Sequence, residues 1–139
     1  IMDINKKREA GRLWAAKDRA KNPHKYSKEI RNKYRKSLLG YLKEKHYALM
    51  RRCEGFEVKK AHLYKGLDYL SFDEFVSWAI NSSKYNKLHS DYVKSNYSNK
   101  IAPSIDRIDS NKGYTLDNIQ WITHSENSRL GAINRHKNN

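Results

Sequence analysis

The chain has 139 residues, a length that predicts one domain, or a small domain with a helical extension, rather than a large multidomain enzyme. Its 29 Lys and Arg outnumber 15 Asp and Glu, which gives a formal net charge of +14, and only 37% of the residues are hydrophobic. This composition excludes a membrane span, collagen and a flexible linker protein. Because so large a charge repels itself unless a polyanion relieves it, the first partner we infer is nucleic acid. An anionic membrane surface comes second, and a merely soluble basic protein is the remaining alternative.

The charge is unevenly placed along the chain. Residues 1–60 hold 19 basic and 7 acidic side chains, a net +12, whereas residues 61–139 hold 10 and 8, a net +2. We therefore predict an α+β protein with a basic helical nucleic-acid-binding extension at 1–60, a helical middle segment at 61–100 and a separate module at 101–139. The single cysteine, Cys53, forms no internal disulfide, so a reducing, cytoplasmic location is expected.

Two helices are predicted in the basic segment. The first surrounds Leu13 and Trp14 and ends at Asn22-Pro23, because the residue before a proline avoids the helical region. The second is expected to run without a break from about Ser27 to Arg52. Its apolar stripe, predicted to be core, consists of Ile30, Tyr34, Leu38, Tyr41, Leu42, Leu49 and Cys53.

Basic side chains populate the rest of that second helix, and they are either a solvated face or a track for phosphates. The interleaved tyrosines and the net charge favour the phosphate track. The side chains predicted to contact DNA are Arg31, Lys33, Arg35, Lys36, Lys43, Arg51 and Arg52, together with Arg129 near the C-terminus.

The middle segment carries signals for two shorter helices. Ser71-Phe72-Asp73-Glu74 has the form of a capping box, which predicts a helix that begins at Phe72 and ends near Asn81. A second helix is expected to carry Tyr85, Leu88, Tyr92 and Val93. We interpret these aromatic side chains as core rather than as a platform for stacked bases.

The C-terminal segment predicts a strand, a loop, a strand and a helix. Residues 104–108 alternate polar and apolar, 110–113 form a turn signal, and 119–123 are a second alternating, β-branched run. Thr123-His124-Ser125-Glu126 is another capping box, so a helix is expected to begin at about His124.

These residues resemble the HNH, or ββα-metal, nucleases, in particular the stand-alone and homing-type members common in phage genomes. The resemblance covers roughly residues 103–131 and rests on three elements in order. They are Ile105-Asp106-Arg107-Ile108-Asp109 at the first strand, Asp117-Asn118 in the loop, and Trp121-Ile122-Thr123-His124-Ser125-Glu126-Asn127 at the strand-to-helix junction.

The resemblance implies that Asp106 and Asn127 ligate one divalent cation. A carboxylate and an amide oxygen make a sparse oxygen site, which suits Mg²⁺ or Mn²⁺ and leaves room for water and for two oxygens of a phosphodiester. Asn118 corresponds to the family residue that braces the loop and orients the general base.

One residue departs from the family pattern. Directly after the first metal carboxylate, where the family usually has its general-base histidine, this chain has Arg107, which accepts no proton near neutral pH. Either another group activates the water, or Arg107 clamps a phosphate in a variant mechanism, or the site does not cut. The candidate replacement bases are His124, His89 and Tyr114, and loss of the proton to bulk water is a slower route.

The resulting expectation is a divalent-metal-dependent endonuclease that nicks or cleaves double-stranded DNA in a bacterial or phage-infected cell. The alternative is a catalytically inactive HNH-like protein that uses its basic surface to bind DNA or a phage or host protein. RNA binding is a third interpretation. Target sequence and oligomeric state are left open.

Overall fold

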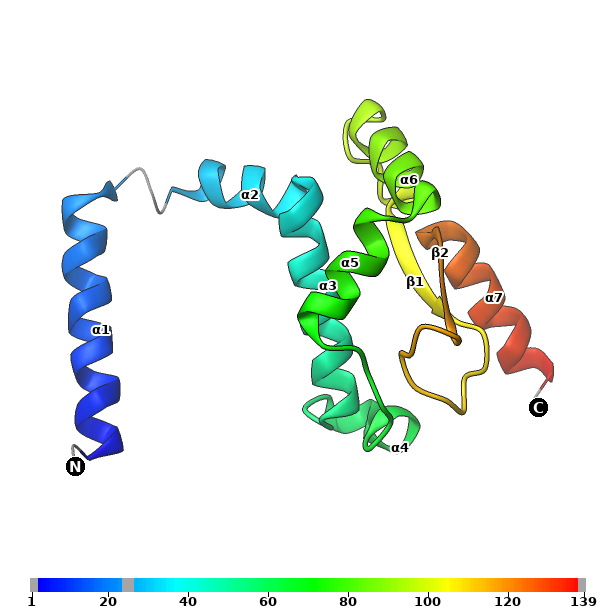
Figure 1. Ribbon diagram of the computed structural model, residues 1–139, viewed down its shortest axis with the longest axis horizontal. Coiled ribbons are helices and arrows are strands. Elements are labelled where there is room, and N and C mark those ends of the chain that lie inside the picture. Colours follow the sequence, from blue (N-terminus) through cyan, green and yellow to red (C-terminus); the bar gives the residue numbers. More distant parts are fainter. Residues whose placement is uncertain (1–2, 24–26, 138–139) are drawn as a thin grey trace. The chain divides into compact units, whose positions relative to one another are not determined.

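The computed structural model describes residues 3–23 and 27–137, and the side-chain surroundings of these residues up to 133 (Figure 1). The protein is mixed α+β, mostly helical, with one two-stranded antiparallel sheet near the C-terminus. It divides into two compact units, Ile1–Arg35 and Lys36–Asn139, so the boundaries expected at residues 60 and 100 both lie inside the second unit. No helix in the described ranges is long and apolar enough to cross a membrane.

The first unit contains α1 (Ile4–Lys21) and most of α2 (Lys28–Lys36). As predicted, α1 ends just before Pro23, where the Asn22 amide donates to the Asp18 carbonyl. Neither helix has a buried residue, and Trp14 is 68% exposed. Ile30 and Tyr34 are also exposed, so the prediction that they belong to a core stripe is wrong.

The predicted long second helix is also wrong, because the chain forms two helices that meet at Ser37. There the backbone is extended, and the Ser37 hydroxyl accepts a hydrogen bond from the Gly40 amide at 3.1 Å. Serine is a preferred N-cap because its side chain satisfies an amide that the new helix leaves without a carbonyl partner. The second helix, α3 (Leu38–Cys53), buries Tyr41, Leu42, Leu49 and Cys53, as the C-terminal part of the stripe predicted.

The middle of the chain is helical, as predicted. Short turns η2 (Val58–Lys60) and α4 (Ala61–Tyr64) lead to α5 (Phe72–Ile80) and α6 (Ser83–Lys94), and η3 (Asn99–Ile101) precedes the sheet. The capping box of α5 is confirmed, because the Glu74 amide donates to the Ser71 hydroxyl at 3.2 Å. The Ser71 hydroxyl in turn donates to the Glu74 carboxylate at 3.0 Å.

The strand, loop, strand and helix expected at the C-terminus are present as β1 (Pro103–Arg107), β2 (Ile119–Thr123) and α7 (His124–Lys137). The strands pair antiparallel with Ile105 opposite Trp121 and Asp106 opposite Gln120. The predicted cap of α7 is confirmed, since the Glu126 amide donates to the Thr123 hydroxyl at 3.2 Å.

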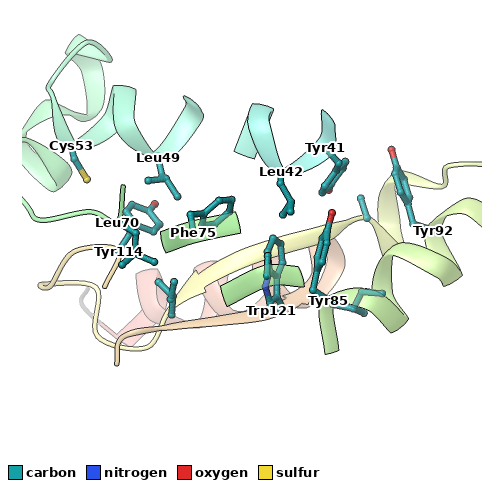
Figure 2. Close-up of a cluster of buried hydrophobic side chains, with 14 residues drawn as sticks. Tyr41, Leu42, Leu49, Cys53, Leu70, Phe75, Tyr85, Tyr92, Tyr114 and Trp121 are labelled. Carbon is teal, nitrogen blue, oxygen red and sulfur yellow. The ribbon is translucent and has the colours of Figure 1, made fainter. Parts of the chain in front are cut away.

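An aromatic core joins the hairpin to the helices that precede it in the chain. Trp121 on β2 stacks on Trp78 of α5 with ring centroids 5.3 Å apart, and its ring centroid lies 4.5 Å from that of Tyr85 on α6. Figure 2 shows Leu42 and Leu49 of α3 directed toward this cluster. The Tyr41 hydroxyl donates to the Pro103 carbonyl, which ties α3 to the start of β1. Tyr85 and Tyr92 are therefore core residues, as predicted.

The loop between the strands is fixed to the middle segment. The Tyr114 amide donates to the Asp68 carbonyl at 2.8 Å, and the Leu70 amide donates to the Tyr114 carbonyl at 3.0 Å. These bonds form a parallel bridge between Tyr69 and Tyr114. A Cβ atom on Gly113 would lie 1.9 Å from the Asp68 carbonyl oxygen, so this close approach requires glycine.

Candidate active site

A pocket of about 170 Å³ lies at the end of β1, and five segments of the second unit contribute to it. Helix α3 provides Arg52, α4 provides Tyr64, and α7 provides Asn127. Asp106 and Arg107 come from β1 and Tyr114 from the loop that follows. The complete lining is Arg52, Tyr64, Ile105, Asp106, Arg107, Ser110, Tyr114, Asn127 and Gly131.

Asp106 and Asn127, the two residues that the resemblance assigns to a metal, line this pocket together. The Gln120 side-chain amide, on the neighbouring strand, donates to Asp106 Oδ2 at 2.8 Å. The Asn127 side-chain amide donates to the Ser104 hydroxyl at 2.8 Å. Because side chains alternate along a strand, Ser104 and Asp106 share one face of β1, and the bond to Asn127 shows that α7 covers this face.

The donor set fits a hard divalent cation. Among the described residues, no group of three or more His, Cys, Asp and Glu side chains could hold a metal ion. The predicted set in this pocket consists of two oxygen donors, the Asp106 carboxylate and the Asn127 side-chain amide. Mg²⁺ is commonly bound by one or two protein oxygens and completes its octahedron with water and phosphate oxygens, so a sparse site is compatible with it.

Asn118 ties the loop together from the inside. Its side-chain oxygen accepts from the Asp109 amide at 2.8 Å, and its side-chain amide donates to the carbonyls of Asp109 at 3.0 Å and Gly113 at 2.8 Å. The side chain is buried, and its bond to the Gly113 carbonyl is shielded from water. This is the loop-bracing position expected of Asn118.

Arg107 projects from the opposite face of β1 and lies on tyrosine rings. Its guanidinium carbon is 4.4 Å from the Tyr64 ring centroid and 5.3 Å from that of Tyr114. One guanidinium nitrogen donates to the Lys112 carbonyl at 3.0 Å. Asp106 and Arg107 thus approach the pocket from the two faces of the same strand end.

Arg52 meets the same two rings from α3. One guanidinium nitrogen donates to the Tyr114 hydroxyl at 3.2 Å, and the guanidinium carbon is 5.8 Å from the Tyr64 ring centroid. The two rings are nearly parallel, with centroids 6.5 Å apart. Burial lowers the pKa of Arg52, but the interactions with Tyr114, Tyr64 and Glu57 outweigh it and raise the pKa, so the side chain stays charged.

Of the three candidate replacement bases, only Tyr114 lies in this pocket. Burial raises the pKa of the Tyr114 phenol despite the opposing effect of Arg52, so the group stays protonated at neutral pH and is a poor proton acceptor. The structure does not bring His124 or His89 to Asp106. His124 is exposed and lines another pocket, with Glu44 and Lys45.

His89 is a core residue. It is buried on α6, where its Nε2 lies 3.0 Å from the Lys36 carbonyl, and its ring contacts the rings of Tyr41 and Tyr85. No histidine of the described part of the chain lines the Asp106 pocket. The expectation that His89 or His124 replaces the family's general base is therefore not supported by their positions.

Most of the predicted DNA-contacting residues lie outside the pocket. Arg31, Lys33 and Arg35 are exposed side chains of the first unit. Exposed positions of the second unit hold Lys36, Lys43 and Arg129, and the Arg51 guanidinium lies over the Tyr47 and Phe56 rings. Arg52 is the exception. Sequence reasoning placed Arg52 on a phosphate track rather than in the site, and it missed Tyr64 because no local pattern links α4 to the hairpin.

Comparison of the chain with known protein families, with curated proteins and with solved structures found no match.

Proposed function

We propose that the protein is a divalent-metal-dependent HNH-type endonuclease that nicks or cleaves double-stranded DNA, of the phage or homing kind. The observation that carries this proposal is the meeting of Asp106 from β1 and Asn127 from α7 in one pocket, in the strand, loop, strand and helix order of the nuclease element. The net charge of +14 supports a polyanionic substrate.

The four residues of the candidate site, Asp106, Arg107, Asn118 and Asn127, have distinct tasks in this proposal. Asp106 and Asn127 would hold Mg²⁺ or Mn²⁺, which when bound polarises the phosphodiester and stabilises the departing oxygen. Asn118 keeps the loop in place through its three hydrogen bonds. Arg107, a permanent cation, stabilises the negative charge that develops on the phosphoryl oxygens.

The attacking water needs a route for its proton, and no histidine in the described part of the pocket provides one. We propose that the proton is lost to solvent. The rate of cleavage is then expected to rise about tenfold per pH unit between pH 6 and 8, without a plateau near the pKa of an ordinary imidazole.

Nicking of supercoiled plasmid tests the proposal. We expect activity with Mg²⁺ or Mn²⁺ and none with EDTA. Asp106→Ala and Asn127→Ala should each lower the rate by about 10³-fold while leaving DNA binding in EDTA nearly intact, because these residues serve the cation. The matched control is Asp91→Ala, which removes an exposed carboxylate of α6 that pairs with Lys87. Wild-type rates in Asp106→Ala would contradict the proposal.

A second candidate function is a catalytically inactive HNH-like binding protein. It is favoured by one observation: the position of the family's histidine is held by Arg107, whose guanidinium lies over the Tyr64 ring and donates to the Lys112 carbonyl. Arg107→Ala and Arg107→His separate the two functions. A nuclease that uses Arg107 should lose orders of magnitude in rate in both variants. An inert wild type beside an active Arg107→His variant would instead favour the binding protein.

A further inference from the structure

Two arginines from distant parts of the second unit converge on one pair of tyrosine rings. Arg52 lies in the last turn of α3 and Arg107 at the end of β1, and both guanidinium groups lie over the Tyr64 ring. Tyr114 contacts both, as a ring beneath Arg107 and as a hydroxyl that accepts from Arg52. Within residues 3–23 and 27–137, neither arginine forms an ion pair with a carboxylate.

Two guanidinium cations in one small pocket repel each other, and the described lining supplies one carboxylate, Asp106, while Glu57 interacts with Arg52. The faces of the tyrosine rings attract cations and lower that cost without neutralising the charge. An anion that reaches both guanidinium groups would neutralise it. With two fixed cations against one carboxylate in its described lining, the pocket is complementary to a further negatively charged group.

The donors for such a group are present. A guanidinium has five N–H donors in a rigid fork. In the described structure Arg52 uses one of its nitrogens toward Tyr114, and Arg107 uses one toward Lys112. The remaining N–H groups suit the oxygens of a phosphate, which arginine forks bind with paired, charge-assisted hydrogen bonds.

We propose that Arg52 and Arg107, held on Tyr64 and Tyr114, form a binding site for one phosphate group of a nucleic-acid backbone, beside Asp106 and Asn127. The volume of about 170 Å³ is below the usual range for sites that enclose a whole small molecule, so the pocket takes one group of a larger ligand. That the phosphate belongs to DNA rests on the proposed function, whereas the phosphate site itself does not.

This inference gives Arg52 a new role. It becomes a residue that contacts the substrate next to the proposed metal position, rather than one of many cations along a helix. The site is then completed by a side chain that lies outside the strand, loop, strand and helix element. Removal of Arg52 should affect the position of the reacting phosphate and not only the overall affinity for DNA.

Titration of the full-length protein with inorganic phosphate in EDTA tests the site directly. The Nε–Hε signals of arginine side chains in ¹⁵N NMR spectra should shift saturably for Arg52 and Arg107, and the wild type alone suffices for this test. Arg52→Gln should abolish the shift of Arg107, and Arg52→Lys, which keeps the charge but loses the fork, should weaken phosphate binding about tenfold. Lys94→Gln removes the same charge from an exposed position at the end of α6 and should bind phosphate like wild type.

The result that would overturn the inference is a uniform, unsaturated shift of all arginine signals, because it would indicate only diffuse attraction to a basic surface. A shift of Arg107 that persists unchanged in Arg52→Gln would overturn it as well.

Single-turnover nicking at saturating protein separates this inference from the proposed function. With Mg²⁺, Arg52→Gln should lower the rate about 10²-fold, while Lys94→Gln leaves it unchanged. If the wild type does not nick DNA, the nuclease proposal fails, and the phosphate titration still decides the inference. If the wild type nicks and Arg52→Gln nicks equally fast, the inference fails and the nuclease proposal stands.

Discussion

The two units of the chain use positive charge in different ways. Residues 1–35 carry 12 basic and 4 acidic side chains, a net +8, and their helices α1 and α2 bury nothing. Residues 36–139 carry 17 and 11, a net +6, around an aromatic core, and two of their arginines are fixed on tyrosine rings. Charge without burial gives general attraction to a polyanion, whereas charge fixed by packing can act on one chosen phosphate.

The largest expected contrast in the free energy of unfolding is between two tryptophan substitutions, one in each unit. Trp121→Ala should lower the free energy of unfolding of the second unit by about 3–5 kcal/mol, because the ring is buried between Trp78 and Tyr85. Trp14→Ala should change it by less than about 0.5 kcal/mol, because the side chain is 68% exposed. Urea unfolding followed by circular dichroism measures both.

A third variant sharpens this contrast. The Trp121 indole N–H is buried and has no hydrogen-bond partner among the described residues. Trp121→Phe removes that unpaired donor while keeping a ring, so it should cost less than Trp121→Ala by about 2 kcal/mol or more. Equal losses in Trp121→Ala and Trp14→Ala would contradict the assignment of the core to the second unit alone.

The next largest effect concerns DNA affinity. If about six phosphates are neutralised by the whole chain, log K should fall against log salt with a slope of about −5. Deletion of residues 1–35 should flatten the slope to about −2 and weaken binding roughly 10²-fold at 0.1 M salt. The reason is that the net +8 of the first unit is lost. Fluorescence anisotropy with duplex DNA in EDTA measures this, with circular dichroism to confirm folding. Unchanged salt dependence would locate the phosphate contacts in the second unit.

A smaller effect is expected at the loop that carries Tyr114. Gly113→Ala should destabilise the second unit by about 2–3 kcal/mol, since the added methyl group collides with the Asp68 carbonyl and the backbone must move. Gly11→Ala is the matched control in the first unit, because no described atom lies within 4 Å of the added Cβ and alanine favours a helix. Thermal unfolding should separate the two variants clearly.

The smallest effect is expected at Gly131, which lines the candidate pocket from α7 and has no atom of the described residues within 4 Å of an added Cβ. Gly131→Ala should raise stability by about 0.5–1 kcal/mol through helix propensity. Gly131→Leu should be nearly as stable but should project a side chain into the pocket and slow nicking. Full activity in Gly131→Leu would show that the substrate does not enter from this side.

Local signals in the sequence predicted the element boundaries well. Pro23 marks the end of α1, because its ring restricts the backbone. The starts of α5 and α7 are marked by Ser71 and Thr123, whose hydroxyls accept hydrogen bonds from amides only a few residues away. Ser37 carried the same signal, yet the apolar periodicity continues across it. Periodicity favoured one helix, whereas the serine cap forms a break there.

The candidate site was predictable only where its residues lie in one short segment. The resemblance to the HNH nucleases predicted that Asp106 and Asn127 come together, and both line one pocket because the two paired strands and the helix that carry them are close in sequence. Arg52 and Tyr64 reach the pocket through the packing of α3 and α4, which no spacing in the sequence reveals. His89 is the opposite case: the sequence offered it as a candidate base, but its side chain is buried in the core.

The parallel bridge between Tyr69 and Tyr114 bears on how this protein could be recombined with others. A chimera that transplants residues 101–137 as a cassette would sever the bonds from Asp68 and Leu70 to the loop and would leave Arg52 behind. The smallest transferable piece is therefore the whole second unit, about a hundred residues long. The first unit has no such requirement for burial, so the protein should tolerate its replacement by another basic segment.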